Sequence, residues 1–261
     1  STTMRMISGT LAPTSGTVHL AGIDLAEQPG RAKNLLGYLP ENPPLHGELT
    51  IDEYLHYCAG IRGVAGAART DAVNDTKERC GLAGLGSRLI GNLSKGYRQR
   101  VGIAQAIVHD PRIIVLDEPT NGLDPTQTQL IRQLIRDLAK EATVILSTHI
   151  MQEVDALCDR VLIIRNGEMA VDAKLEELRE SNNLLLTTSF TKDKLTMLLQ
   201  PLNAITNIDE IPDEGGNPHY RLCVEEMSDH PALCGEIANL VVTAGGTLYS
   251  INQENRDLET L

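Results

Sequence analysis

IIVLDEPTNGLDP, residues 113–125, is the stretch that decides the fold. It opens with four apolar residues and runs directly into two acids, Asp117 and Glu118. An apolar run this short and without alternation is typical of a strand covered on both faces, as in a parallel sheet. Because open parallel sheets bind ligands at the carboxyl ends of their strands, the segment predicts an acid pair at a ligand-binding rim.

Two later apolar runs have the same character, TVIL at 143–146 and VLII at 161–164, and predict two more buried strands. Residues 125–140 carry leucine and isoleucine along one helical stripe, so an amphipathic helix connects the first two strands. Strand, helix and strand in that order form a βαβ unit and predict an α/β fold with a parallel sheet. The Asn166–Gly167 pair that follows the third run predicts a hairpin turn.

The rest of the chain predicts two domains. We expect an α/β domain over residues 1–172, with a mostly helical subdomain at about 45–110 and a further short strand at Tyr38–Leu39. Beyond about residue 175 the order of short strands and helices is βαββαβ, which is the arrangement of ferredoxin-like domains. Residues 173–261 are therefore expected to form a small α+β accessory domain.

Composition excludes several classes of protein. Lys and Arg number 23 against 35 Asp and Glu, a formal net charge of −12, which argues against nucleic acid as a partner because that binding needs dense basic surface. The five cysteines include no CxxC pair, so a disulfide scaffold and a zinc ribbon are both disfavoured and reduced thiols in a cytosolic protein are expected. No apolar run approaches the roughly 18 residues that a transmembrane helix requires.

The acid pair at the end of the first strand suits nucleotide hydrolysis. Asp117 would hold Mg²⁺ through water, since this hard cation prefers carboxylate oxygens. Glu118 would polarise the attacking water as a general base. His149 directly follows the strand at 143–146, so it is expected at the same rim, where it would contact a terminal phosphate or the attacking water. The alternatives are an acid pair that only faces solvent and a histidine that is a bystander.

Two helix starts complete the candidate site. Ser94 and Gly96 stand at the beginning of a predicted helix that ends near Pro111, and a hydroxyl beside an unhindered glycine backbone is suited to binding an anion. The competing interpretation is that Ser94 only caps its helix. Asp124 precedes Pro125, a strong capping arrangement, so we expect it to cap the next helix and also consider it a contact to a second subunit.

The motifs LSKGY, IIVLDEP, NGLDP and STH, in this order, resemble the signature, Walker B, D-loop and H-loop motifs of the ATPase subunits of ABC transporters. The resemblance covers about residues 1–170. The phrases GYLPENPPL and MQEVDALCDRVLII are similar to the ATPases of ABC-2-type export systems, including those of gliding motility and multidrug efflux. The resemblance implies a P-loop NTPase-type ABC ATPase domain that binds ATP and Mg²⁺.

The resemblance also implies how such subunits assemble. A homodimer or heterodimer would close head to tail over two ATP molecules, each lying between Glu118 and His149 of one subunit and Ser94 and Gly96 of the other. Closure would drive an ABC-2-type transmembrane permease, docked on the helical stretch after Glu41, from a cytoplasmic position on the inner face of the cell membrane. The cargo would be chosen by that permease.

This chain departs from the family pattern at several positions. Glu41 stands where the family usually has a glutamine that reaches Mg²⁺, and Lys95 and Tyr97 replace a glycine and the glutamine of LSGGQ. The phosphate-cradling loop GxxxxGK[ST] is absent from the 261 residues. The resemblance places Ser1 at the Mg²⁺-binding hydroxyl of that loop and Thr2 just after it.

From these positions we expect a chain that lacks pieces at both ends and has no ATPase activity by itself. The function implied is an ATP-binding and ATP-hydrolysing subunit that energises a membrane exporter. Two alternatives stay open. One is an ABC ATPase acting on DNA or ribosomes. The net negative charge argues against it, and so does the absence of long coiled coils or a second cassette from these residues. The other is a regulatory subunit that binds nucleotide without turnover. The C-terminal region is expected to stabilise the dimer or the permease contact.

Overall fold

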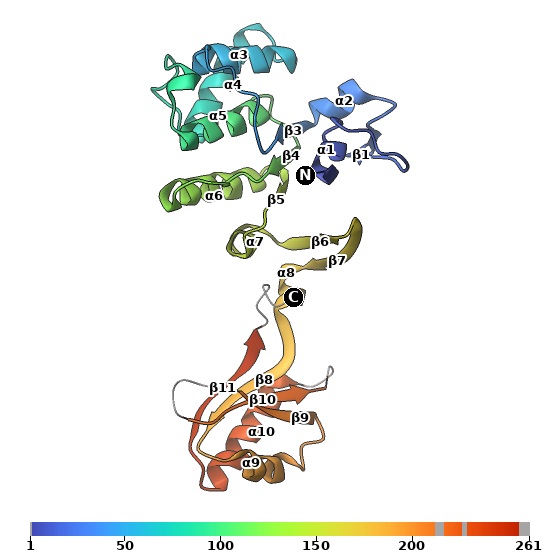
Figure 1. The fold of residues 1–261 in the computed structure, drawn as a ribbon, viewed down its shortest axis with the longest axis vertical. Coiled ribbons are helices and arrows are strands. Elements are labelled where there is room, and N and C mark those ends of the chain that lie inside the picture. The colour runs from blue at the N-terminus through green and yellow to red at the C-terminus, as the bar shows by residue number, and fades with distance from the viewer. Residues whose placement is uncertain (1, 212–216, 226–228, 256–261) are drawn as a thin grey trace. The chain divides into compact units, whose positions relative to one another are not determined.

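A computed structural model describes residues 2–211, 217–225 and 229–255 (Figure 1). Contacts divide the chain into two compact units, Ser1–Leu157 and Cys158–Leu261, and each is described here by itself. The boundary expected at 172/173 and the helical subdomain expected at 45–110 stay predictions.

The first unit contains the predicted βαβ arrangement. Its three-stranded sheet has the order β3 (Leu36–Leu39), β4 (Ile113–Asp117), β5 (Thr143–Ser147), and both pairings are parallel. The helix α6 (Pro125–Ala139) connects β4 to β5. The register sets Leu39 opposite Leu116 and Asp117 opposite Ser147, so the loops that follow all three strands leave from one rim of the sheet.

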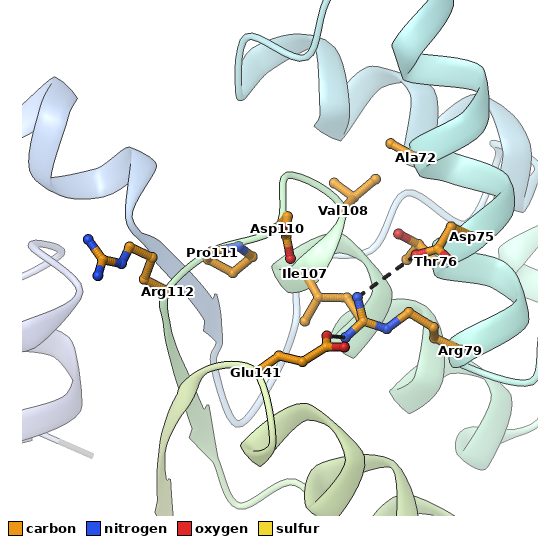
Figure 2. A pocket seen from close by; sticks show the side chains of 10 residues that line it. All are labelled: Ala72, Asp75, Thr76, Arg79, Ile107, Val108, Asp110, Pro111, Arg112 and Glu141. Carbon is orange, nitrogen blue, oxygen red and sulfur yellow. Dashed lines mark hydrogen bonds and ion pairs between the residues drawn. The ribbon is translucent and has the colours of Figure 1, made fainter.

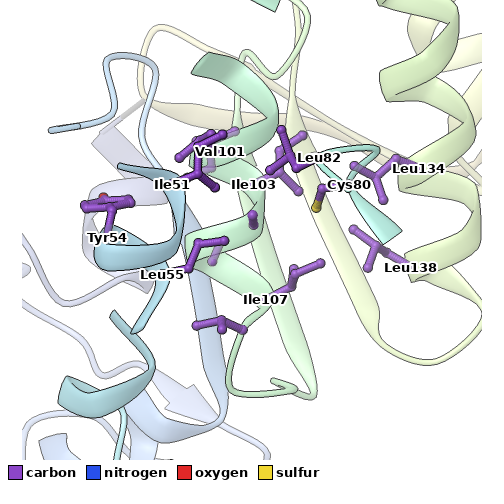
Figure 3. Close-up of a cluster of buried hydrophobic side chains, with 14 of the residues drawn as sticks. Ile51, Tyr54, Leu55, Cys80, Leu82, Val101, Ile103, Ile107, Leu134 and Leu138 are labelled. Atoms are coloured by element: carbon purple, nitrogen blue, oxygen red, sulfur yellow. The ribbon is translucent and has the colours of Figure 1, made fainter. Parts of the chain in front are cut away.

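Helices surround this sheet (Figure 1). The helix α5 (Lys95–Ile107) packs against β3 so closely that a Cβ on Gly37 would collide with the backbone carbonyl oxygen of Ala106. A cluster of buried apolar side chains, including Leu55, Ile103 and Leu138, joins α5 to α6 and to the neighbouring helices (Figure 3). The remaining elements of this unit are α1 (Thr2–Ile7), β1 (His19–Leu20), β2 (Ile23–Asp24), α2 (Pro29–Asn34), α3 (Ile51–Ile61), α4 (Gly66–Arg79), the 3-10 helix η1 (Ile90–Asn92) and α7 (Met151–Leu157).

The third apolar run does not belong to the parallel sheet, and that prediction is wrong. Residues 161–164 lie in β6 (Arg160–Arg165), which forms a two-stranded antiparallel sheet with β7 (Glu168–Lys174) and exposes Leu162 and Ile164. The predicted hairpin is confirmed, because Asn166 and Gly167 both have positive φ, 53° and 84°. That tight turn brings the chain straight back along β6. The strands that are buried on both faces are also fewer than expected, since β5 is only half-buried.

The second unit has the βαββαβ order expected for a ferredoxin-like domain. Its four-stranded antiparallel sheet has the order β11 (Leu248–Asn255), β8 (Glu180–Thr188), β10 (His219–Val224), β9 (Ile205–Ile211). The helices α9 (Lys192–Leu199) and α10 (His230–Thr243) pack on it, and the short α8 (Leu175–Arg179) precedes β8. Their buried side chains form a separate core around Tyr220, whose hydroxyl donates to the Phe190 carbonyl at 2.8 Å. Nowhere in the described part of the chain does a helix reach the length and apolar character needed to cross a membrane.

Candidate functional site

The acid pair lies at the carboxyl end of β4, as the strand pattern predicted. Asp117 is 3% exposed, and its Oδ1 accepts a hydrogen bond of 2.5 Å from the Ser147 hydroxyl. The backbone N–H of Glu118 donates to the same Ser147, to its carbonyl at 3.2 Å and to its Oγ at 3.1 Å. Ser147 therefore ties both acids to the end of the neighbouring strand β5.

Glu118 and His149 are in direct contact. Nδ1 of His149 lies 3.1 Å from Oε1 and 3.1 Å from Oε2 of Glu118. The carboxylate is 19% exposed and the imidazole 70% exposed, so the pair spans the border between protein and solvent. The hydrogen bond to Glu118, reinforced by its negative charge, raises the pKa of His149 above its usual value. This geometry fits a proton on Nδ1 that is donated to the carboxylate.

The backbone at Glu118 is strained. Its φ of 50° lies in the left-handed region, which non-glycine residues rarely occupy. The bonds to Ser147 hold it there, together with the Asn121 N–H, which donates to the Glu118 carbonyl at 3.2 Å. Strain of this kind persists where the surrounding structure fixes the residue, and it concentrates at functional positions.

The donor set fits a magnesium–phosphate ligand better than a resident metal ion. The described residues contain no group of three or more His, Cys, Asp or Glu side chains that could hold a metal. Mg²⁺ typically takes one or two protein carboxylates and completes its shell with water and substrate phosphates. Asp117, buried and oriented by Ser147, would supply a carboxylate for such an ion.

Ser94 caps its own helix, which is the alternative to anion binding that the sequence left open. Its Oγ accepts from the Tyr97 N–H at 3.4 Å at the start of α5. Gly96 is buried because α6 approaches it closely: a Cβ at Gly96 would lie 2.7 Å from Oε1 of Gln127. The same Oε1 accepts from Nη2 of Arg100 at 2.7 Å. Gly96 therefore has a packing role in this subunit, and a phosphate-binding role for Ser94 and Gly96 stays a prediction.

Asp124 caps α6 as expected. Its Oδ1 accepts from the Gln127 N–H at 2.9 Å, and Pro125 occupies the first helical position. Gln127 thus connects this cap to Arg100 on α5. The Lys95 ammonium lies against Gly122 in the loop before α6, where a φ of 66° favours glycine.

The remaining predicted site residues are Ser1, Thr2 and Glu41. Glu41 is exposed in the loop after β3, on the same rim as Asp117. Thr2 is exposed at the start of α1, and Ser1 lies outside the described residues. Within the described ranges, neither Thr2 nor Glu41 has a hydrogen bond or ion pair to Asp117, Glu118 or His149. The structure therefore brings the two acids and the imidazole together, and a role for Thr2 and Glu41 at the site stays a prediction.

One residue of this region was missed by the sequence reasoning. Glu153 in α7 is completely buried. Its carboxylate accepts hydrogen bonds from the hydroxyls of Thr120 and Thr148 and faces Arg132 of α6. An acid on a short helix usually indicates a solvated face, so nothing in the local pattern marks it.

A cavity of about 540 Å³ lies elsewhere in the same unit (Figure 2). Arg79 of α4 lines it and is already neutralised, with Nη2 2.9 Å from Glu141 and Nη1 3.8 Å from Asp75. Pro111 and Arg112 lead into β4, and Glu141 closely precedes β5, so the cavity is at the amino ends of the strands. It is therefore on the rim opposite Glu118 and is not the candidate nucleotide site.

Comparisons with known proteins place the chain in a family. Residues 1–121 match the family model described as ABC transporter. The ATP-binding protein NatA of Bacillus subtilis is 39% identical over 69% of this chain and 74% of its own length. The bacitracin transport ATP-binding protein BcrA of Bacillus licheniformis is 30% identical over 99% of this chain and 81% of its own. An uncharacterised ABC transporter ATP-binding protein, YxlF of Bacillus subtilis, is 34% identical over 74% of this chain. The matched region is 64% of the length of YxlF.

A solved structure shows the same fold. The structure of an ATP-binding subunit of an ABC transporter superposes with a TM-score of 0.61 at 30% identity, over 68% of this chain and 74% of that one.

Proposed function

Because the chain belongs to the family of ABC transporter ATP-binding proteins, which are ATPases, we propose that it is the ATP-hydrolysing part of a membrane exporter of the ABC-2 type. The observation that carries this proposal is the contact of Glu118 with His149 beside the buried Asp117. A base, an imidazole and a carboxylate suited to hold a cation, together on one rim, are groups that promote hydrolysis of a phosphoanhydride.

Each residue has a distinct role in the proposed reaction. Glu118 accepts a proton from the attacking water, and its hydrogen bond to His149 holds the carboxylate in place for that step. His149, mostly exposed, presents its other ring nitrogen toward the transferred phosphate. Asp117 would hold Mg²⁺, which when bound neutralises charge on the phosphates. Ser147 keeps both acids oriented, so that little reorganisation is needed when charge develops.

We propose that two such subunits share each nucleotide. Ser94 and Gly96 at the start of α5 would face the ATP of the other subunit, where the α5 N-terminus favours an anion. Asp124 and Glu41 would contribute from the loops that border the same interface. Hydrolysis would remove the charge that holds the two half-sites together and so reopen the dimer.

The partner that we propose is a transmembrane permease, with the ATPase on the inner face of the cell membrane. On α3, just beyond the Glu41 loop, Tyr57 and Ile61 are largely exposed and offer an apolar docking surface. Two relatives are named for a bacitracin transport protein and, in Escherichia coli, a probable multidrug ABC transporter, and we propose outward transport by analogy with the cargoes in those names.

The test uses a polypeptide that carries these 261 residues behind a GxxxxGK[ST] loop, reconstituted with its permease. Glu118→Gln should reduce ATP turnover by about 10²–10⁴-fold, the usual contribution of a general base. Glu141→Gln removes a carboxylate from the opposite rim and should leave turnover unchanged. Full turnover in the Glu118→Gln variant would overturn the proposal.

A further inference from the structure

We propose that Glu153 is a positioning residue that holds Glu118 and His149 in their relative geometry by anchoring both of the loops that carry them. This inference rests on the proposed function, in which those two side chains act together. Within the described residues, Glu153 has no hydrogen bond to Glu118 or His149. It would act on them through the threonines that it binds.

Both oxygens of the Glu153 carboxylate are used, one for each loop. Oε1 accepts a short hydrogen bond from the Thr120 hydroxyl, and Thr120 follows Glu118 by two residues. Oε2 accepts from the Thr148 hydroxyl at 2.8 Å, and Thr148 immediately precedes His149. A single buried side chain therefore bridges the loop after β4 and the loop after β5.

The histidine loop is fixed further at its far side. The Ile150 N–H donates to Oγ1 of Thr148 at 3.1 Å, and the Glu153 N–H donates to the Ile150 carbonyl at 2.9 Å. His149 thus lies between two residues that are both tied to the first turn of α7. Although its side chain is largely exposed, its backbone has little freedom.

The burial of Glu153 makes the anchor strong and selective. The side chain is fully inaccessible to water, and Nη2 of Arg132 on α6 lies 3.7 Å from Oε1 and compensates its charge. Within the described residues, Nε of Arg132 is buried without a hydrogen-bond partner, while Nη2 of the same guanidinium faces Glu153. Removing one member of such a charged pair leaves the other charge uncompensated, which is costly in proportion to its burial.

A purely structural role would predict a loss of stability alone, so the test follows the Glu118–His149 contact itself. In residues 1–261 the imidazole signal of His149, identified by its loss in His149→Gln, is titrated by NMR. The Glu153→Gln variant should lower the pKa of His149 to the value that it has in a Glu118→Gln variant. Glu141→Gln is the matched control, because the Glu141 carboxylate is also paired with an arginine. It should leave the His149 titration unchanged.

Thr148→Val separates positioning from charge. Glu118 and Glu153 are the charged groups that act on His149, and Glu153→Gln also removes a charge. Thr148→Val keeps both carboxylates and removes the two hydrogen bonds of the Thr148 hydroxyl, the one donated to Glu153 and the one accepted from the Ile150 N–H, so it should likewise lower the His149 pKa. Thr148→Val also decides the question if Glu153→Gln does not fold. An unchanged His149 pKa in a folded Thr148→Val variant would overturn the proposal.

Turnover supplies the second readout. In the complete ATPase, a displacement of the Glu118 loop or the His149 loop should reduce kcat by about 10²-fold, the effect of a misplacement of about 1 Å. KM for ATP should change little, because Glu153 is fully buried and so offers no surface to the nucleotide. If Glu118→Gln leaves turnover unchanged, the proposed function fails while the titration still decides whether Glu153 anchors the two loops.

Discussion

Nδ1 of His149 is equidistant, at 3.1 Å, from the two carboxylate oxygens of Glu118, although 31 residues separate them in the chain. The contact depends on the parallel register of β4 and β5, which sets Asp117 opposite Ser147. A slip of one residue in that register would turn every side chain of one strand to the other face. Strand pairing therefore brings the two loops that carry Glu118 and His149 to the same rim.

Ser147→Ala should weaken both the fold and the site. Its hydroxyl donates to buried Asp117 and accepts from the Glu118 N–H, so its loss leaves a buried carboxylate oxygen with one partner fewer. We expect a cost of about 1–3 kcal/mol in the free energy of unfolding. Urea unfolding measures it, with Ser250→Ala in the second unit as the control for loss of a bonded hydroxyl. An unchanged midpoint would show that Ser147 does not support the acid pair.

The His149–Glu118 pair should make stability depend on pH. Since the folded-state pKa of His149 is raised, the pair's contribution is complete below the usual value of 6.5 and is lost as pH rises through the raised value. The difference in unfolding free energy between the native chain and His149→Gln should therefore be larger at about pH 5.5 than at about pH 9. A difference that is constant across this range would contradict the assigned contact.

His109 should have the opposite effect in acid. Burial, with a further contribution from the charge of Arg62, lowers the pKa of His109 to about 4, and its Nε2 lies 3.2 Å from the Leu36 carbonyl oxygen. Between about 4 and 6.5 the unfolded chain binds a proton that the folded chain does not, so stability should rise with pH across this window. His109→Gln should flatten that slope in urea unfolding measured at several pH values. A slope equal to that of the native chain would refute the prediction.

Gly37→Ala should destabilise the first unit. The new methyl group would collide with the carbonyl oxygen of Ala106 in α5, which is backbone and cannot rotate away, and would lie 3.0 Å from Pro111. We expect a loss of about 1–3 kcal/mol. Gly30→Ala in α2 has open space around it and should cause no loss. Thermal unfolding of the two variants provides the comparison, and equal melting temperatures would contradict it.

Asp124→Ala should remove the cap of α6. The lost hydrogen bond to the Gln127 N–H should cost about 0.5–2 kcal/mol, whereas Asp124→Asn should retain most of the stability because asparagine also caps. If turnover of the complete ATPase falls in both variants while Asp124→Asn stays stable, the carboxylate has a role beyond the cap. Retained turnover in Asp124→Asn would limit Asp124 to capping.

The sequence predicted the parts of the fold that are set by short-range patterns. The βαβ unit, the Asn166–Gly167 hairpin and the βαββαβ order are all present. The pairing partner of a strand could not be predicted in the same way. The apolar character of residues 161–164 does not identify which strand they pair with. Pairing was therefore predicted correctly for β4 with β5 and wrongly for β6.

The candidate site shows the same division. The rim position of Asp117, Glu118 and His149 follows from strand ends and parallel pairing, so motif order was sufficient to place them. Glu153 escaped because its role depends on two threonines and an arginine that reach it only in the folded protein. A buried acid of this kind has no periodic signature on a helix of seven residues.

The second unit folds around apolar side chains of its own, and the described members of that cluster all fall between residues 184 and 251. The hydrogen bonds that hold Glu118 and His149 join residues of the first unit alone. The apolar side chains of the second unit are therefore under a packing constraint of their own, separate from the one that keeps the acid pair and the imidazole in place.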